Sequence, residues 1–244
     1  MTAAKPRNEL HTFGEINFVK VPTGEFMMGS DSYGDETPYH KVNIPYDYFI
    51  GRYPLSWEQY KMFGDISGEK VQIPSGKDDH PVTNVRWNEA QDYILWLNST
   101  YGEDLPEGLE FCLPSEAEWE KAARGPESNE YPWGERFEKE LCNTSNSQLN
   151  GTTKVGKYSP KGDSVYGAAD MAGNIYEWTQ SLYKPYPYDQ KDGRENLVSS
   201  GDRVPRGGSW FDSGTGSRSA YRFYNYYPKD WLPLTGFRVA IAPR

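Results

Sequence analysis

The sequence predicts an α+β fold in which a few short helices flank antiparallel strands and much of the chain is irregular. Three observations support this prediction. The N-terminal part alternates apolar and polar residues in short stretches, which is typical of half-buried strands. Three short segments that follow carry helix-start signals. After about residue 125 helical periodicity ends and turn residues punctuate the chain, which favours short strands joined by long loops.

The first strands are predicted from alternation. Residues 13–30 alternate and end in Phe26-Met27-Met28-Gly29, a pattern that predicts a hairpin with Pro22-Thr23-Gly24 as its turn. Another strand is expected between Val42 and Ile50. A length of 244 residues suits one large globular domain. We therefore expect a single domain over residues 15–244, preceded by an N-terminal extension of residues 1–14.

The three helices are predicted from their first residues. In a capping box, a Ser hydroxyl and the side chain three residues later each accept a hydrogen bond from a free backbone N–H at the start of a helix. This pattern occurs twice, in Ser56-Trp57-Glu58-Gln59 and in Ser115-Glu116-Ala117-Glu118. Asn88 is expected to open the middle helix. That helix shows apolar residues at positions i, i+3, i+4 and i+7, which places them on one face: Ala90, Tyr93, Ile94 and Leu97.

Composition excludes several functions. Asp and Glu number 35 against 26 Lys and Arg, a formal net charge of −9, which argues against a nucleic-acid partner because phosphate contacts need cations. No apolar stretch is long enough to cross a membrane, and Met1 to Leu10 lack the apolar core of a secretory signal. We expect a soluble chain without membrane insertion or signal peptide. The sequence leaves its compartment and oligomeric state open.

Two cysteines, Cys112 and Cys142, are too few and too far apart for a zinc site or a disulfide framework. A single disulfide bond between Cys112 and Cys142 is an alternative that the sequence leaves open.

The C-terminal segment, residues 203–240, is the candidate ligand-binding region. Regular elements, Arg206-Gly207-Gly208-Ser209-Trp210 and Arg218-Ser219-Ala220-Tyr221-Arg222, enclose a stretch without periodicity from Phe223 to Tyr227. Tyrosine suits a contact surface because it offers a large area at low entropic cost and a hydroxyl for hydrogen bonds. The alternative is that these aromatic residues belong to the core. The predicted contact residues are Phe211, Asp212, Ser213, Phe223, Tyr224, Asn225, Tyr226, Tyr227, Leu232 and Leu234.

The motifs taken together resemble the formylglycine-generating-enzyme-like, or sulfatase-modifying-factor, domain, from about residue 15 to the C-terminus. The resemblance implies a C-type-lectin-type fold of that subclass. The matching segments include Pro81-Val82-Thr83-Asn84-Val85-Arg86-Trp87, Leu113-Pro114-Ser115-Glu116-Ala117-Glu118-Trp119, Tyr131-Pro132-Trp133-Gly134, Asp170-Met171-Ala172-Gly173-Asn174-Ile175-Tyr176-Glu177-Trp178 and Gly236-Phe237-Arg238.

The resemblance also indicates what is missing. Enzymes of this family hold copper with a Cys-x4-Cys pair, and the corresponding positions here are Gly214 and Ser219, neither of which can bind Cu(I). A second, iron-dependent branch needs a His-x3-His-x-Glu cluster, whereas the histidines here, His11, His40 and His80, are far apart in sequence. We predict no catalysis and no redox cofactor. The alternatives are an oxidase or other metalloenzyme with a different site, and a structural subunit of a stable complex.

Among non-catalytic members, the chain resembles the variable proteins of diversity-generating retroelements, in which selected adenines of the C-terminal segment are hypermutated. Mutated AAC or AAT codons never give Lys, Glu, Gln, Met or Trp. Residues 211–217, 223–227 and 232–235 contain only reachable types, whereas Lys229 and Trp231 would be fixed positions. This resemblance implies a variable surface that binds a protein or another macromolecule.

The resemblance further implies structural calcium beside the Gly-Asn-x-x-Glu-Trp element. The implied ligands are the side chains of Asp170 and Glu177 and the backbone carbonyls of Gly173 and Ile175. Oxygen ligands of this kind suit Ca²⁺.

Overall fold

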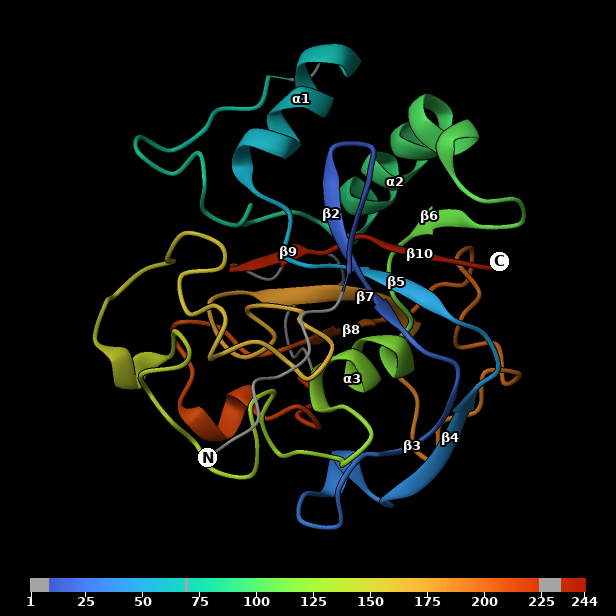
Figure 1. Cartoon of the computed structure of the whole chain (residues 1–244), viewed down its shortest axis with the longest axis vertical. Coiled ribbons are helices and arrows are strands. Elements are labelled where there is room, and N and C mark those ends of the chain that lie inside the picture. The colour runs from blue at the N-terminus through green and yellow to red at the C-terminus, as the bar shows by residue number, and fades with distance from the viewer. Residues whose placement is uncertain (1–8, 69, 224–233) are drawn as a thin grey trace.

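The computed structural model describes residues 9–68, 70–223 and 234–244 (Figure 1). Its strands are β1 (Leu10–Phe13), β2 (Ile16–Val21), β3 (Gly24–Met28), β4 (His40–Ile44), β5 (Tyr48–Gly51), β6 (Glu110–Cys112), β7 (Tyr176–Leu182), β8 (Arg203–Arg206), β9 (Thr235–Phe237) and β10 (Ala240–Ala242). The α-helices are α1 (Trp57–Ser67), α2 (Trp87–Tyr101) and α3 (Glu116–Arg124). Short 3-10 turns are η1 (Gly34–Glu36), η2 (Gly102–Asp104), η3 (Ser145–Ser147) and η4 (Gly214–Ser217).

The strands form three small sheets, as expected for an α+β fold. The largest is antiparallel, with the order β1-β2-β5-β10-β6, so strands from both ends of the chain pair in one sheet. A second sheet pairs β3 with β4. The third has the order β8-β7-β9, in which β7 runs antiparallel to β8 and parallel to β9. Of the C-terminal strands, β10 therefore lies between β5 and β6 in the large sheet, and β9 forms one edge of the third sheet.

Two strand predictions are wrong about which segments pair with each other. Residues 22–24 do not form a hairpin turn; they carry the chain from β2 in the large sheet to β3 in the two-stranded sheet. The hairpin is instead β1–β2, whose turn at Gly14 and Glu15 has φ of 52° and 61°. The single strand expected from Val42 to Ile50 is two strands, β4 and β5, in different sheets. Alternation predicts strands but does not identify which strands pair.

The first strand lies near the N-terminal end of the described residues. Strand β1 begins at Leu10, within the stretch expected to precede the domain, and pairs with β2 over its whole length. Residues 10–14 thus belong to the folded domain.

The helix starts are confirmed. Ser56 and Ser115 cap α1 and α3, each within a complete capping box, and α1 ends at Gly68 with a left-handed φ of 80°. The middle helix begins one residue earlier than expected, at Trp87, with Arg86 as N-cap. Within the described residues no helix has the length and apolar character needed to cross a bilayer.

Two clusters of buried side chains form the core, one on each side of the strands. In Figure 1, α1 and α2 lie on one side and α3 on the other. The first cluster includes Phe18 and Leu97 and packs both helices on the large sheet. The second includes Met28 and Trp119 and packs α3 against β3 and β4. Helix α3 is buried along its whole length, charged residues included, so each of its charges needs a partner.

Candidate ligand-binding surface

Buried ion pairs attach the C-terminal segment to α3. Arg222 donates to both carboxylate oxygens of Glu116 at 2.7 and 3.1 Å, and Arg206 donates to Glu120 at 2.5 Å. All four side chains are almost completely excluded from solvent. Burial by itself would raise the pKa of Glu116, but Arg222 and Arg206 outweigh that effect and hold the pKa below its usual value. The segment between Arg206 and Arg222 is therefore pinned at both ends.

A third arginine fixes the middle of the segment. Arg218 forms a two-pronged contact with Glu36 at 2.6 and 2.8 Å, and its guanidinium lies 3.8 Å from the ring centroid of the exposed Tyr33. Because bidentate pairs restrict orientation as well as distance, this contact fixes the segment against η1. Arg206, Arg218 and Arg222 thus fix the framework of the segment by ion pairs with buried carboxylates.

Two glycines permit a sharp bend before the exposed part of the segment. Gly207 and Gly208 have φ of 93° and 70°, values that residues with a side chain rarely adopt. A Cβ atom on Gly208 would lie 2.4 Å from the carbonyl oxygen of Gly216. The backbone of η4 therefore lies directly against this bend.

Three predicted contact residues lie together just beyond the bend. Phe211 is 71% exposed and meets the ring of Trp210 edge-on at 5.8 Å. Ser213 is exposed, whereas Asp212 is half-buried and accepts hydrogen bonds from the backbone N–H and hydroxyl of Ser209 at 2.9 and 2.5 Å. Asp212 thus shapes the loop that presents its two neighbours.

Tyr176 connects this loop to the other described contact residues. Its ring lies 4.7 Å from that of Phe223, and its backbone N–H donates to the carbonyl of Leu234 at 3.0 Å. Burial raises the pKa of its hydroxyl, and the nearby Asp212 raises the pKa further. Phe223 and Leu234 are themselves half-buried. The sequence analysis missed Tyr176 as a site residue, because its neighbours in the chain indicate only a turn before a strand.

We define the display surface as these five predicted residues, and the buried Tyr176 packs against one of them, Phe223. Its described members are Phe211, Asp212, Ser213, Phe223 and Leu234. The other predicted contact residues lie outside the described residues, and their orientation stays a prediction: Tyr224, Asn225, Tyr226, Tyr227 and Leu232.

The position that corresponds to the first copper ligand has no room for a side chain. A Cβ atom on Gly214 would lie 2.5 to 2.7 Å from three ring atoms of Phe137. Ser219, at the second position, is completely buried, and its backbone N–H donates to the carbonyl of Glu130 at 2.8 Å. The space that a side chain at position 214 would take is thus occupied by the ring of Phe137.

The cysteines and histidines have other roles. Cys112 and Cys142 are buried and not bonded to each other, and burial raises the pKa of each thiol to about 12, which keeps it protonated. His40 Nε2 accepts from the backbone N–H of Tyr188 at 2.8 Å. His80 Nδ1 lies 2.9 Å from the hydroxyl of Thr152. These histidines thus join segments that are far apart in the sequence.

The resemblance implied that Glu177 binds calcium, but its carboxylate is already engaged. Arg238 donates to both oxygens at 2.5 and 2.7 Å, and the Trp119 indole N–H donates to one of them at 2.7 Å. The guanidinium supplies the positive charge that a calcium ion would bring. Glu177 is 1% exposed, so the pair is closed to solvent.

The other implied calcium ligands are similarly occupied. Asp170 accepts from the backbone N–H of Gly156 at 2.6 Å, and burial raises its pKa to about 6 in spite of that bond. The carbonyl of Gly173 accepts from the N–H of Ile175 at 2.9 Å. The described part of the chain contains no group of three or more His, Cys, Asp or Glu side chains placed to hold a metal ion. Glu177 thus already has a cation as its partner, and the calcium site stays a prediction.

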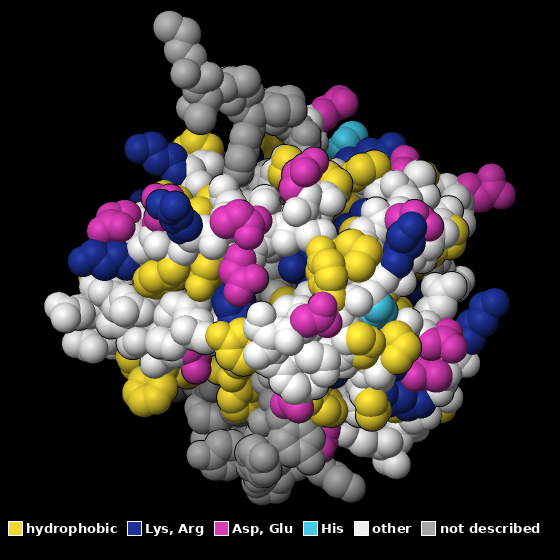
Figure 2. All heavy atoms as spheres, turned by 90° about the horizontal axis from the view of Figure 1, so that it is seen from below, with side chains coloured by type: hydrophobic (Ala, Val, Ile, Leu, Met, Phe, Trp, Pro, Cys, Tyr) yellow, Lys and Arg dark blue, Asp and Glu magenta, His cyan; other side chains and the backbone are white. Residues whose placement is uncertain are grey.

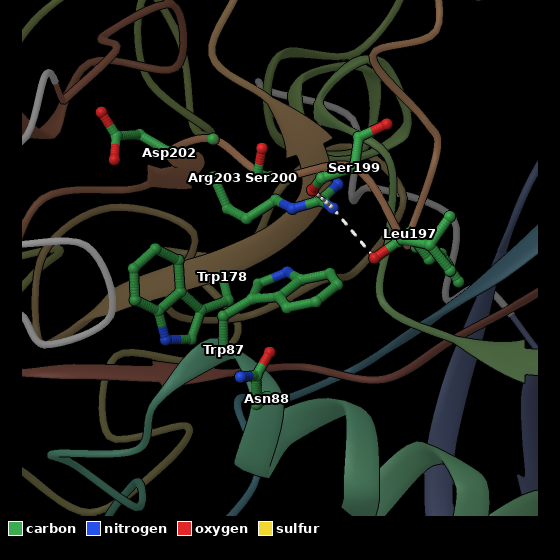
Figure 3. Close-up of a pocket in the computed structure, with 10 residues that line it drawn as sticks. Trp87, Asn88, Trp178, Leu197, Ser199, Ser200, Asp202 and Arg203 are labelled. Carbon is green, nitrogen blue, oxygen red and sulfur yellow. Dashed lines mark hydrogen bonds between the residues drawn. The ribbon is translucent and has the colours of Figure 1, made fainter.

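A cavity of about 310 Å³ lies at the start of α2 and is a candidate for a different reaction centre (Figure 3). Trp87 and Trp178 form part of its wall. The guanidinium of Arg203 lies 4.2 Å from the centroid of a Trp87 ring and donates to the carbonyls of Gln180 and Leu197. The guanidinium N–H groups of Arg203 thus fix the surrounding loop. The lining of the cavity also includes Asn88, Leu197 and Asp202.

The fold and the site together define the class of protein: an α+β domain of the C-type-lectin type, in its formylglycine-generating-enzyme-like form. The chain belongs to the sulfatase-modifying factor enzyme 1-like domain family, whose model matches residues 5–243.

Relatives of the chain are mixed in activity. It is 32% identical to serine/threonine-protein kinase Pkn1 of Chlamydia trachomatis over 249 residues, 90% of this chain but only 37% of the kinase. It is 26% identical to inactive C-alpha-formylglycine-generating enzyme 2 of Bos taurus over 271 residues, 86% of this chain and 81% of that protein. Hercynine oxygenase of Mycolicibacterium smegmatis is 29% identical over 243 residues, 79% of this chain and 54% of the oxygenase. The family therefore includes both enzymes and inactive proteins.

Two solved structures share the fold. PvdO from Pseudomonas aeruginosa superposes with a TM-score of 0.81 at 24% identity, covering 98% of this chain and 99% of PvdO. Treponema denticola variable protein 1 superposes with a TM-score of 0.72 at 22% identity, covering 96% of this chain and 99% of that protein. At these identities the likeness concerns the fold alone.

Proposed function

We propose that this chain is a non-catalytic ligand-binding protein whose display surface contacts another macromolecule. The observation that carries the proposal is the ring of Phe137 at the Cβ position of Gly214. A cysteine there would require the ring to leave, and Ser219 offers a hydroxyl where Cu(I) needs a thiolate. The copper-dependent chemistry of the family's enzymes has no ligands at this place.

The display surface has the properties of a contact site. It combines an exposed aromatic residue, Phe211, with a frame held by buried ion pairs of Arg206, Arg218 and Arg222. A stiff frame reduces the entropy lost on binding, and aromatic anchors supply most of the binding free energy of typical interfaces. In Figure 2, which views the lower end of Figure 1, hydrophobic side chains lie next to acidic and basic ones. That mixture suits a protein partner better than a nucleic acid, in keeping with the net charge of −9.

The proposal includes diversification of this surface by a retroelement. Support comes from residues 211–217 and 232–235, which contain only types that adenine mutagenesis of AAC or AAT codons can reach. Treponema denticola variable protein 1 has the same fold, which makes the fold compatible with such a role. The test is the flanking DNA together with population sequences. A template repeat, a reverse transcriptase gene and variation confined to these positions are expected; invariant positions 211–217 across strains would refute it.

Binding is tested by photo-crosslinking from the display surface. A benzoyl-phenylalanine replaces Phe211, and the matched control places it at Leu95, which is 65% exposed on the outer face of α2. We expect one defined macromolecular adduct from position 211 in extracts of the host and none from position 95. Equal labelling from both positions would contradict a specific surface.

Two other functions are separated by simple measurements. A metalloenzyme predicts stoichiometric copper or iron in the purified protein by elemental analysis, which we do not expect. A structural subunit predicts a stable oligomer in solution that buries Phe211, and crosslinking from position 211 would then join copies of this chain or a constant partner.

A further inference from the structure

A second cavity, of about 480 Å³, lies between the β1–β2 turn, the start of α1 and the middle of α2. These elements are at the upper end of the molecule in Figure 1, whereas η4, drawn in orange-red, is near the lower end. The cavity is therefore separate from the display surface. Its volume falls in the range of small-molecule sites, which are typically apolar hollows with a few polar groups at fixed positions.

The wall of this cavity is mainly apolar and aromatic. It includes Tyr53, Leu55, Met62, Tyr93 and Trp96. The rings of Tyr93 and Trp96 lie 5.2 Å apart at 55°, so the two aromatic groups hold each other in place.

Three of the polar residues that line the cavity carry carboxylates, beside the neutral Asn17, Ser56 and Gln59. Glu15, Glu58 and Asp79 line it, all three are exposed, and no ion pair joins any of them to a cation among the described residues. The described lining contains no Lys, Arg or His. Three carboxylates without counter-ions give the entrance a negative potential that attracts cations and repels anions.

Hydrogen bonds fix the backbone of the segments that carry these three carboxylates. The carbonyl of Glu15 accepts from the side chain of Gln59 at 3.4 Å, and the carbonyl of Asp79 accepts from the N–H of Val155 at 2.9 Å. The N–H of Glu58 donates to the carbonyl of Asp78 at 3.0 Å. The entrance is thus formed by three segments that hydrogen bonds hold to their neighbours.

We infer that this cavity binds a small organic ammonium ion with an aromatic or apolar body. The ammonium group is attracted by the carboxylates and by the π faces of the aromatic wall, and the body displaces water from the apolar surface. The inference is independent of the proposed function, since it uses no residue of the display surface.

The first test compares three ligands of similar size: tyramine, para-ethylphenol and hydroxyphenylpropionate, which are cationic, neutral and anionic. Titrations followed by NMR on the full chain are expected to give a Kd of about 1 mM for tyramine. The neutral and anionic compounds should bind at least about tenfold more weakly, and added salt should weaken tyramine alone. Equal affinity for all three ligands, or no tyramine binding at about 10 mM, would overturn the inference.

The second test changes the protein. Glu58→Gln and Asp79→Asn remove two charges with little change of shape, and each should weaken tyramine about fivefold, the effect of roughly 1 kcal/mol at a partly solvated site. Glu135→Gln, an exposed carboxylate outside the cavity, is the matched control and should leave the Kd unchanged. Equal losses in all three variants would mean that only net charge matters and would overturn the inference. A lysine-rich peptide that binds far more tightly than tyramine would assign the site to a protein partner instead.

Discussion

Substitution of Gly214 by alanine tests whether the copper-ligand position is filled. Gly214 has no left-handed φ, so alanine meets no backbone strain there, and the contact with Phe137 alone decides the outcome. The new Cβ atom would lie 2.5 Å from the nearest ring carbon, about 1 Å closer than the optimum for two carbon atoms. Because the ring of Phe137 packs against Tyr131 at 5.6 Å, it cannot withdraw without losing that contact.

The expected cost is moderate. Overpacking of this kind costs about 1–3 kcal/mol, from which the lower entropy of the unfolded alanine chain subtracts about 0.5 kcal/mol. We expect Gly214→Ala to lower the free energy of unfolding by about 1–2 kcal/mol. For a chain of this size that corresponds to a fall in Tm of roughly 3–6 °C.

The assay is thermal and urea unfolding of a set of variants. Gly102→Ala is the matched control, since Gly102 has helical dihedrals (φ −61°, ψ −30°) and no neighbouring atom lies within 4 Å of the place that a Cβ atom would take. It should be neutral or slightly stabilising. Phe137→Ala should remove the clash, so that Gly214→Ala costs nothing further in that background. If Gly214→Ala behaves like Gly102→Ala, or costs the same with and without the ring of Phe137, the position is open and has room for a copper ligand.

Three further predictions concern charge, metal and surface. Burial raises the pKa of Asp170 in the folded state to about 6, above its unfolded value, so ionisation of this carboxyl opposes folding. The free energy of unfolding should therefore fall as the pH rises from about 4 to 6. Asp170→Asn should flatten that slope in urea titrations. Because Arg238 already neutralises Glu177, removing calcium with a chelator should change the Tm by less than about 1 °C, and a drop of several degrees would restore the calcium assignment. Phe211→Ala removes an exposed ring and should alter the free energy of unfolding by less than about 0.5 kcal/mol while abolishing binding of the macromolecular partner in pull-downs from host extracts; a large loss of stability would mean that the ring is core.

Helices were predictable from the sequence because their signals are local. A capping box spans four residues, and those at Ser56 and Ser115 appear in the structure with both reciprocal hydrogen bonds. Strand pairing was not predictable in the same way. The alternation in residues 13–30 is real, but β2 pairs with β1 and β5 and not with β3. Nothing in the local pattern distinguishes these partners.

The candidate site was predictable in part. Phe211 was predicted as a contact residue, and its side chain is exposed. Tyr176 and Phe137 were not predicted, because each acts on residues far along the chain. Phe137 fills a space at Gly214 from 77 positions away, a relation that no local spacing encodes.

The sequence by itself determined which segments become helices, where the chain bends sharply, and which thiol and imidazole ligands the family's enzymes possess and this chain lacks. Only the tertiary structure decided how the charges are matched. Arg218 meets Glu36 across 182 positions, and Arg238 closes over the carboxylate of Glu177 that the motif had offered to calcium. The physical reason is that caps and turns are satisfied within a few residues, whereas a buried charge must find its partner wherever the fold brings an opposite charge within reach.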